Sequence, residues 1–439
     1  MYYNSINNKL NIKQFCNIFF SNIPKNKTLF FPFKLPFFNN KYLNYLKKLN
    51  YVNFSFEISK LFLNNISDED LYKILYNSYN NKKFIKLEKI SNENHLLNLN
   101  NGFTLTFKDI AMIPLSNLIN YFSFKNKKKF IIFCATSGDT GASANNSFKN
   151  IKNVKIFTFY PFNMVSNIQR KQMSTLISKN ILNYSIIGNF DISQYFVKKI
   201  FENIKNNEKI FLLSVNSINW FRIIMQLIYY CYISIKNYNE KKFNFIIPSG
   251  NFGNALSAYL SKKIGFPINK IIPCTNDNFY LDNYIKNNKI ENILLKRTIS
   301  PSIDISIPSN FIRLINKNFF KKKIINEINN DIFSDKIYNK HIINSIEYFY
   351  QKYNKIYDPH TITSISSFYK DNNDNNNNNN KIVVSTSYPI KFIFSIKKII
   401  PNIKIKFNIK KIFSLKEKYK LFSQNFLVLI NSIKKNINV

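Results

Sequence analysis

Glycine is scarce in this sequence, and its scarcity makes the few glycines informative. Only seven occur among 439 residues, where an average usage of about 7% would give roughly thirty. Lys, Asn, Ile, Phe and Tyr are abundant, and because their codons are rich in A and T, a nucleotide bias explains all five together. A glycine that persists against such a bias is expected where no side chain fits. Five of the seven fall in three short motifs: Gly102, Gly138, Gly141, Gly250 and Gly253.

Cysteine and histidine are also few, and their spacing predicts no metal site. The four cysteines lie far apart without a CxxC pair, which indicates a reducing compartment and no zinc site. The three histidines show no ligand spacing. We therefore expect a cytoplasmic protein without a bound metal. The residues concerned are Cys16, Cys134, Cys231, Cys274, His95, His341 and His360.

Negative charge is in short supply. There are 24 Asp and Glu residues against 63 Lys and Arg residues, and the formal net charge is +39. Such a charge is typical of proteins that bind nucleic acid or a membrane surface. The lysines are scattered, however, without the arginine content or the concentrated arm of a nucleic-acid reader. We expect a solvated surface and no nucleic-acid partner; a basic nucleic-acid-binding protein is the alternative from a different class.

No long hydrophobic run is free of polar residues. The most apolar span, residues 211–235, is interrupted by Asn216, Asn219, Arg222 and Gln226, and so polar a membrane helix is disfavoured. The first residues, M-Y-Y-N-S-I-N-N-K, lack the charged start and apolar core of a signal peptide. We therefore expect no membrane partner.

The order of the apolar runs predicts an α/β fold. From about residue 127, short apolar runs alternate with helix-length segments, as in parallel sheets covered on both faces. We predict a mostly helical N-terminal region at 1–94, a smaller α/β domain at 95–215 and a larger one at 216–439, with a disordered insertion at 371–380. The predicted strands are Phe130–Ala135, Val154–Tyr160, Ile181–Ile187, Ile210–Val215, Phe243–Pro248, Lys270–Cys274 and Lys381–Ser385.

One lysine among many lies in an unusual setting. The stretch N-G-F-T-L-T-F-K-D-I-A-M places Lys108 near Phe103, Leu105 and Phe107, with Asp109 directly behind it. Apolar neighbours withdraw an ammonium group from water and favour the neutral amine, which is a nucleophile and can form a Schiff base. We interpret Lys108 as a candidate carrier of pyridoxal phosphate. A core lysine whose amine reaches solvent explains this stretch better when it is taken alone.

Two glycine motifs follow predicted strands and resemble anion sites. A-T-S-G-D-T-G, residues 135–141, offers backbone N–H groups and hydroxyls at a strand-to-helix turn. It lacks the lysine of a nucleoside-triphosphate loop, and a purely structural turn explains it equally well. P-S-G-N-F-G-N, residues 248–254, lets the backbone approach an anion and adds donors from Ser249 and Asn251. We predict a phosphate site there.

Four further segments could contribute to a site. N-S-I-N-W-F-R-I-I-M-Q, residues 216–226, opens a helix with Asn, Arg and Gln on one face; an arginine paired with a backbone carbonyl is the structural alternative to an anion ligand. T-I-S-P-S-I-D-I-S-I-P-S-N-F-I-R, residues 298–313, is a loop fixed by its prolines. The hydroxyls of S-T-S-Y-P-I-K-F, residues 385–392, could reach a ring nitrogen, and D-P-H-T at 358–361 is another candidate loop.

In this order, the motifs closely resemble those of the threonine synthase family in its long-chain form. The family has H-G-P-T-L-A-F-K-D at its Schiff-base lysine, and this chain has N-G-F-T-L-T-F-K-D. The segments A-T-S-G-D-T-G, N-S-I-N-x-x-R-x-x-x-Q, S-G-N-F-G-N and S-P-S-x-D-I-x-x-P-S-N all match. The resemblance runs from L-F-F-P near residue 29 to about residue 392. It implies pyridoxal-phosphate fold type II, the tryptophan-synthase-β-like fold, with two parallel-sheet α/β domains.

The resemblance also implies a role for each matching residue. Lys108 is expected to hold pyridoxal 5′-phosphate and to move protons. The cofactor phosphate is expected at Ser249, Gly250, Asn251, Phe252, Gly253 and Asn254, and the ring nitrogen at Ser385 or Thr386. The substrate carboxylate is expected at Thr136, Ser137, Gly138, Asp139 and Thr140, and the substrate phosphate at Ser217, Asn219 and Arg222.

The chain departs from the family pattern at four places. Asn101 stands where the family has histidine, Phe103 where it has proline, and Tyr388 where it has histidine. The family loop P-x-G-x-I-S appears as P-F-N-M-V-S at 161–166, without its glycine. None of these changes removes a group that the implied chemistry needs.

The implied activity is that of a lyase acting on a small molecule. It would convert O-phospho-L-homoserine and water to L-threonine and phosphate, the last step of threonine biosynthesis. Another enzyme of the same fold, such as a threonine or serine dehydratase, is the first alternative. The sequence does not indicate whether the protein is a monomer or a homo-oligomer.

Overall fold

The chain forms two compact units. The computed structural model describes all residues except 7, 22–28, 81, 92, 205, 208, 288–293, 316–329, 372–379, 404–411 and 438–439. Unit 1 comprises Met1–Ala111, Ser217–Pro389 and Ile393–Ile403; unit 2 comprises Met112–Asn216, Ile390–Phe392 and Lys404–Val439. Most of the insertion predicted at 371–380 lies outside the described residues.

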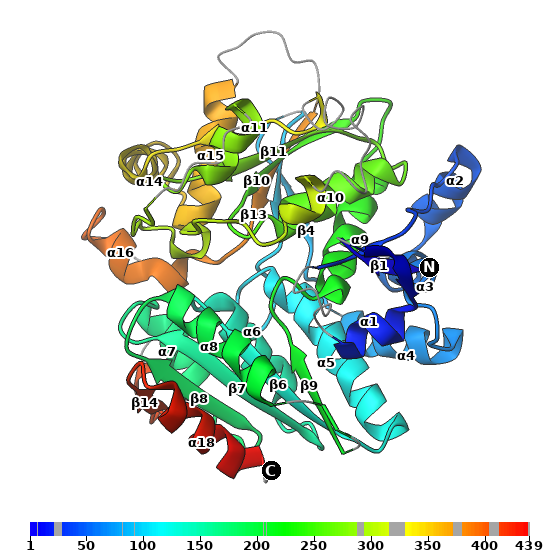
Figure 1. Cartoon of the computed structure of the whole chain (residues 1–439). Coiled ribbons are helices and arrows are strands. Elements are labelled where there is room, and N and C mark those ends of the chain that lie inside the picture. Colours follow the sequence, from blue (N-terminus) through cyan, green and yellow to red (C-terminus); the bar gives the residue numbers. More distant parts are fainter. Residues whose placement is uncertain are drawn as a thin grey trace. The chain divides into compact units, whose positions relative to one another are not determined.

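Unit 1 contains a six-stranded sheet with the order β12-β11-β10-β13-β5-β4 (Figure 1). Neighbouring strands are parallel except for the antiparallel pair of β4 and β5. Strands β10, β13 and β5 are therefore adjacent and run in one direction. The strands are β4 (Lys86–Lys89), β5 (His95–Asn98), β10 (Phe243–Pro248), β11 (Ile268–Thr275), β12 (Asp335–Lys336) and β13 (Asn380–Ser385).

The most buried helix of unit 1 is α9 (Trp220–Lys236), of which only Tyr232 and Lys236 are not fully buried. A helix that is largely apolar around its circumference belongs in a protein interior, and α9 packs against α2, α3 and α10; its polar exceptions Arg222 and Gln226 are buried too. Among the described helices, none combines the length and apolar character that crossing a membrane requires. The other helices of unit 1 from α10 onward are α10 (Gly253–Lys263), α11 (Tyr280–Asn287), η1 (Pro301–Ile303), α12 (Ile312–Ile315), α14 (Asn339–Tyr353), α15 (Pro359–Asp371) and α16 (Ile393–Lys397).

Among its described residues, the N-terminal part of unit 1 combines four helices with a small antiparallel sheet of order β2-β1-β3. The L-F-F-P segment forms β3 in this sheet. Helix α3 buries Phe54, Ile58 and Phe62 on one face, as its helical spacing requires. The elements are β1 (Tyr3–Ser5), β2 (Asn8–Lys13), α1 (Phe15–Ser21), β3 (Phe30–Pro32), α2 (Asn40–Lys48), α3 (Tyr51–Phe62) and α4 (Asp68–Tyr79).

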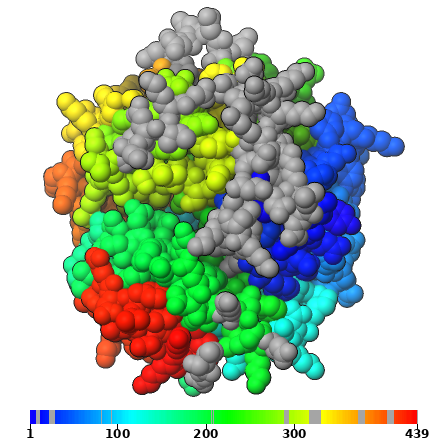
Figure 2. All heavy atoms as spheres, viewed as in Figure 1, coloured from blue at the N-terminus to red at the C-terminus, as the bar shows by residue number. Residues whose placement is uncertain are grey.

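Unit 2 contains a five-stranded, fully parallel sheet with the order β14-β8-β7-β6-β9. Its core includes Phe133, Phe157 and Tyr184 from the strands and Leu429 from α18. Helix α18 lies at the surface (red in Figure 2) and buries one face on this core. The elements are β6 (Lys129–Ala135), α6 (Asp139–Phe148), β7 (Val154–Pro161), α7 (Asn167–Ser174), β8 (Ile181–Ile186), α8 (Phe190–Asn203), β9 (Ile210–Ser214), β14 (Lys420–Phe422) and α18 (Phe426–Ile437).

The predicted α/β class is confirmed, and each predicted strand is present within one or two residues of its predicted bounds. The division into units differs from the predicted one. Because β5 pairs with β13, the segment up to Ala111 belongs to unit 1 and not to a separate smaller domain. Because β14 pairs with β8, the end of the chain belongs to unit 2. Helix α5 (Lys108–Lys125) begins in unit 1 and continues in unit 2.

Candidate active site

The predicted cofactor residues of unit 1 follow three neighbouring strands. The loop to Lys108 follows β5, residues 249–254 follow β10, and β13 ends at Ser385, with Thr386 directly after it. These strands are adjacent and parallel, so their carboxyl ends share one edge of the sheet. Ligands of open α/β sheets bind at that edge. Three segments that are distant in sequence are thus brought together.

Backbone hydrogen bonds join the Lys108 loop to the end of β13. The Phe107 N–H donates to the Thr386 carbonyl at 3.0 Å, and the Tyr388 N–H donates to the Leu105 carbonyl at 3.1 Å. Lys108, the first residue of α5, follows this paired segment directly. The structure therefore holds the start of α5 beside Thr386.

Asp109 fixes the turn that precedes Lys108. Its buried carboxylate accepts hydrogen bonds from the Thr104 N–H at 2.8 Å and the Thr104 hydroxyl at 2.5 Å. A side chain at Gly102 would overlap with this carboxylate, which explains why glycine persists there.

Lys108 is half-buried, and of its predicted aromatic neighbours Phe107 contacts the amine whereas Phe103 does not shield it. Its Nζ lies 5.0 Å from the centroid of the Phe107 ring. Phe103 is 65% exposed, and its ring faces the Lys82 Nζ at 5.6 Å. Phe103 thus supplies little of the shielding that the sequence predicted, and the replacement of the family proline lies on the surface.

Residues 249–254 form a tight turn between β10 and α10. Phe252 adopts a left-handed conformation with a φ of 60°. A Cβ atom at Gly250 would lie 2.6 Å from the Ser302 carbonyl oxygen, closer than real side chains come. The backbone of the loop at 298–313 thus lies directly against this turn, and only glycine fits between them.

The loop at 298–313 also holds Asn251. The Asn310 N–H donates to the Asn251 carbonyl at 3.1 Å, and the Ser309 hydroxyl donates to the Asn251 side-chain oxygen at 3.1 Å. Both the backbone and the side chain of Asn251 are therefore held by this loop.

Buried donors without partners surround this turn. The Ser249 and Ser302 hydroxyls and the Asn254 amide nitrogen are buried and have no hydrogen-bond partner among the described residues. The hydroxyls of Tyr229 and Tyr230 both donate to the Asn254 side-chain oxygen, at 2.5 and 2.8 Å. The amide NH₂ of Asn254 is therefore the end left for a ligand. Buried unsatisfied donors are rare in proteins and suit an anion.

The structure distinguishes the two hydroxyls predicted for the ring nitrogen. Ser385 Oγ accepts a hydrogen bond from the Asn100 side chain at 3.0 Å and lies 3.1 Å from Thr361 Oγ1. Because the Thr361 hydroxyl donates to Asp358, Ser385 must donate to Thr361. The Thr386 hydroxyl, by contrast, forms no hydrogen bond with any described residue. Thr386 is the hydroxyl that remains for a ligand.

The residues predicted for the substrate phosphate lie at the start of α9. A Cβ atom at Gly253 would lie 3.7 Å from the Ser217 Cβ, so this segment lies beside the turn at 249–254. Asn219 caps α9, and its side-chain oxygen accepts a hydrogen bond from the Phe221 N–H at 3.0 Å. Arg222 is buried.

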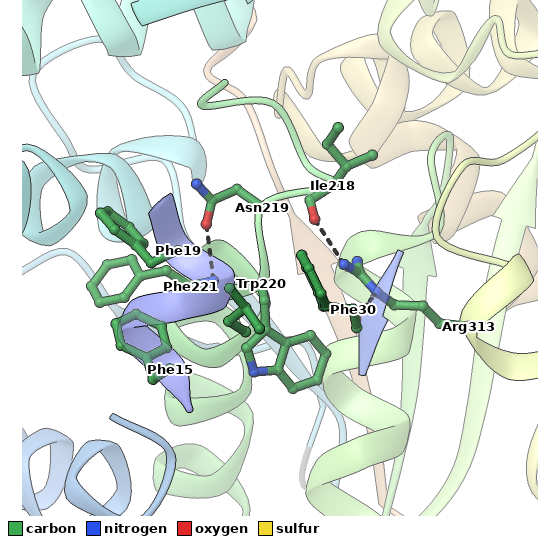
Figure 3. Close-up of a pocket in the computed structure, with 9 residues that line it drawn as sticks. Phe15, Phe19, Phe30, Ile218, Asn219, Trp220, Phe221 and Arg313 are labelled. Atoms are coloured by element: carbon green, nitrogen blue, oxygen red, sulfur yellow. Dashed lines mark hydrogen bonds between the residues drawn. The ribbon is translucent and has the colours of Figure 1, made fainter. Parts of the chain in front are cut away.

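An aromatic pocket adjoins this segment (Figure 3). It contains none of the predicted cofactor residues. Its charged residue, Arg313, donates from Nε to the Phe30 carbonyl at 3.0 Å, from Nη2 to the Ile218 carbonyl at 2.7 Å, and from Nη1 to the Asn310 side chain. Burial lowers the pKa of Arg313 to about 9, so it stays charged at neutral pH. The pocket is lined by Phe15, Ile18, Phe19, Phe30, Ile218, Asn219, Trp220, Phe221 and Arg313.

Replacing Arg313 by methionine is expected to lower the free energy of unfolding by about 2–4 kcal/mol, because three acceptors that are buried or half-buried lose their donor. The guanidinium lies 5.4 Å from the ring of Trp220, the only tryptophan, so tryptophan fluorescence during urea unfolding reports on this site. Arg297→Met, at an exposed arginine, is the control. Equal unfolding midpoints for the two variants would contradict the expectation.

In unit 2, the turn predicted for the substrate carboxylate is held by Thr136. Its hydroxyl oxygen accepts the N–H groups of Gly138 and Gly141, both at 2.9 Å. Gly138 has a φ of 133°, and a side chain there would lie 2.5 Å from Gln169. Ser137 and Thr140 are half-buried. The turn thus depends on glycine, as the sequence predicted.

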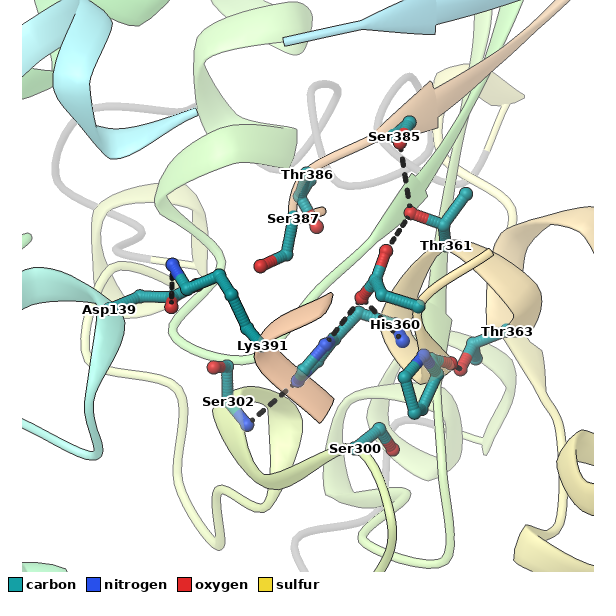
Figure 4. A network of polar contacts seen from close by, with 12 residues as sticks. Asp139, Ser300, Ser302, His360, Thr361, Thr363, Ser385, Thr386, Ser387 and Lys391 are labelled. Atoms are coloured by element: carbon teal, nitrogen blue, oxygen red, sulfur yellow. Dashed lines mark hydrogen bonds and ion pairs between the residues drawn. The ribbon is translucent and has the colours of Figure 1, made fainter. Parts of the chain in front are cut away.

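Asp139 of this turn is bound within unit 2. Its Oδ1 accepts a hydrogen bond from Gln169 at 2.7 Å and pairs with the Lys391 Nζ at 2.5 Å (Figure 4). All three side chains are buried. The carboxylate itself would repel a substrate carboxylate, so any contribution of Asp139 to an anion site comes from its backbone N–H. Neither partner of Asp139 was indicated by the sequence, because the contacts span 30 and 252 positions (139 to 169 and 139 to 391).

The comparisons with known proteins agree with these motifs. The family described as "Threonine synthase N terminus" matches residues 2–79. The threonine synthase of Saccharomyces cerevisiae is 37% identical over 309 residues, covering 65% of this chain and 60% of that protein. The threonine synthase of Buchnera aphidicola subsp. Acyrthosiphon pisum is 38% identical over 298 residues, covering 67% and 68%. The matched part thus spans less than two thirds of the yeast relative's length.

One solved structure is similar over almost the whole chain. The crystal structure of PLP-bound threonine synthase from Brucella melitensis superimposes with a TM-score of 0.89 at 25% identity, and it covers 99% of each chain.

Proposed function

The chain belongs to the threonine synthase family, and on that basis we propose that it converts O-phospho-L-homoserine and water to L-threonine and phosphate with pyridoxal 5′-phosphate. One observation carries the proposal. The Lys108 loop, the turn at 249–254 and Thr386 follow three adjacent parallel strands of unit 1. An amine, a turn suited to a phosphate group (residues 249–254, called the phosphate cup below) and a neutral hydroxyl lie at one edge of the sheet. They match the aldehyde, the phosphate and the ring nitrogen of this cofactor.

The residues present fit the cofactor. The buried donors of Ser249, Ser302 and Asn254 have no protein partner among the described residues, and a phosphate would satisfy them. Gly250 leaves room that any side chain would fill. The backbone N–H groups of Asn251, Phe252 and Gly253 precede or open α10, where a helix favours an anion.

Within this proposal, each residue has a limited task. Lys108 holds the cofactor through its amine and later carries a proton to and from the substrate. Thr386 donates to or accepts from the ring nitrogen, and a hydroxyl there leaves the nitrogen without a full counter-charge. The bound cofactor supplies the electron sink for carbanion chemistry. Ser217, Asn219 and Arg222 remain the proposed ligands of the substrate phosphate, and the turn at 136–140 remains the proposed ligand of its carboxylate.

The activity is tested by supplying O-phospho-L-homoserine and L-serine side by side to the purified protein with the cofactor. Threonine and phosphate in equal amounts are expected from the first substrate. Ammonia from serine without threonine formation would favour a dehydratase instead. Salt-sensitive binding of DNA without visible absorption from bound cofactor would favour the nucleic-acid alternative.

Gly250→Ala is expected to weaken cofactor binding by about 10- to 100-fold. The new methyl group would meet the backbone of Ser302, and overpacking of this kind costs about 1–3 kcal/mol. Gly253→Ala is the matched control, since its nearest atom belongs to a side chain, Asn310, at 3.3 Å. Titration of both variants with pyridoxal phosphate by visible absorption gives the two constants. Equal losses would contradict the role assigned to the Ser302 backbone.

A cytoplasmic location belongs to the same proposal and rests on the separated cysteines, which form no disulfide among the described residues. Fractionation of the source cells with an antibody to the chain would test it.

A further inference from the structure

The D-P-H-T segment at the start of α15 forms a buried polar cluster in unit 1 (Figure 4). Asp358 accepts hydrogen bonds from the His360 N–H at 3.0 Å and from the Thr361 hydroxyl. His360 Nδ1 lies 2.8 Å from Asp358 Oδ1. Asp358, His360 and Thr361 are all buried. None of these residues has a role in the activity proposed above.

One arm of the cluster, formed by His360, reaches the phosphate cup. The Ser302 N–H donates to His360 Nε2 at 3.0 Å. Nε2 must therefore carry a lone pair, so the ring proton resides on Nδ1 and is donated to Asp358. The Ser302 carbonyl is the group that lies against Gly250. His360 in this tautomer thus fixes the wall of the cup.

The other arm, formed by Thr361, reaches the end of β13, next to the hydroxyl proposed for the ring nitrogen of the cofactor. Thr361 Oγ1 lies 3.1 Å from Ser385 Oγ and accepts its hydrogen bond, because the Thr361 proton is donated to Asp358. Ser385 immediately precedes Thr386, whose hydroxyl is the one left for the ring nitrogen. Thr361 thus orients the end of β13.

We propose that Asp358, His360 and Thr361 are positioning residues that align the phosphate cup and the ring partner of the cofactor through two separate arms. The inference rests on the proposed use of pyridoxal phosphate. Asp358 joins the arms, because one of its carboxylate oxygens orients His360 and the other orients Thr361. The two arms can be tested separately. Breaking the hydrogen bonds of His360 should disturb the contacts with the phosphate, and breaking those of Thr361 should disturb the contact with the ring nitrogen.

The test compares pyridoxal phosphate with pyridoxal, which keeps the ring and the aldehyde but lacks the phosphate. His360→Leu is expected to lower the affinity for pyridoxal phosphate by about tenfold and to leave that for pyridoxal unchanged, because loss of one oriented hydrogen bond loosens only the cup. Thr361→Val is expected to lower both affinities equally, by about fivefold, and to shift the visible absorption of the bound cofactor.

Matched controls separate positioning from general loss of stability. Thr363→Val removes a buried hydroxyl from the same helix that bonds only the Pro359 carbonyl, and His341→Leu removes an exposed histidine. Neither variant is expected to change the ratio of the affinity for pyridoxal phosphate to the affinity for pyridoxal. If His360→Leu fails to fold, His360→Gln, which retains an acceptor for the Ser302 N–H, is expected to keep a ratio within about threefold of the wild type.

Equal losses for both ligands in His360→Leu, or an unchanged spectrum in Thr361→Val, would overturn the inference. If His360→Leu does not fold, a ratio in His360→Gln outside that range would overturn it as well. A wild-type protein that binds neither ligand would instead overturn the proposed function, so the two failures are distinguishable.

Discussion

Lys108→Ala is expected to lower kcat for threonine formation by at least about 10³-fold. The variant would lose both the amine proposed to hold the cofactor and the group proposed to move protons, and alanine supplies neither. Phosphate release from O-phospho-L-homoserine measures the rate, and visible absorption measures whether the cofactor is still attached through a lysine. Binding of the cofactor without covalent attachment is expected to persist, because the cup at 249–254 is unchanged.

The matched control is Lys125→Ala. Lys125 ends the same helix, and its amine donates to the Tyr121 hydroxyl at 2.7 Å. Its loss is expected to leave kcat within about twofold. A Lys108→Ala variant that retains the visible band of a lysine-bound cofactor would place the attachment on another lysine. That result would overturn the central residue assignment while leaving the fold untouched.

Lys391→Met is expected to lower the free energy of unfolding of unit 2 by roughly 3–5 kcal/mol, because it leaves the buried Asp139 carboxylate without its cation. Asp139 belongs to the turn at 136–140, which is the proposed ligand of the substrate carboxylate. Substrate binding is therefore expected to weaken as well. Faster hydrogen–deuterium exchange in peptides covering 129–148 would show where the loss falls. The unit lacks tryptophan, which makes exchange the more suitable measurement.

Two variants separate charge pairing from packing. Adding Asp139→Asn to Lys391→Met removes both charges, and stability is expected to return in part, because no isolated charge remains buried. Lys199→Met breaks the exposed pair with Glu202 and is expected to cost less than about 1 kcal/mol. A double variant less stable than Lys391→Met alone would contradict the pairing argument.

Much of the fold could be predicted from the sequence because its signals are local. The strands β6, β10 and β13 each contain a short run of apolar residues, as is typical of buried parallel strands. The persistence of Gly102 and Gly250 predicted positions without room for a side chain, and in the structure each faces an atom that would clash. The sequence could not indicate which atom that is.

What the sequence left open depends on contacts between distant residues. It predicted Ser385 or Thr386 for the ring nitrogen, and only the partners of Ser385, Asn100 and Thr361, distinguish them. It divided the chain at residue 95, because the pairing of β5 with β13 has no local signature. The shielding expected from Phe103 failed for a related reason: an aromatic side chain in an apolar stretch can still lie on the surface.

The pairing of β5 with β13 also sets an order of events during synthesis. Asn100, just after β5, contacts Ser387 across 287 residues, and at about 5–20 residues per second the ribosome needs roughly tens of seconds to make that distance. Throughout that time the edge of β5 that pairs with β13 lacks its partner. A nascent chain that stops before β13 is therefore expected to be bound by chaperones or to aggregate, and extending it by residues 380–385 is expected to release it.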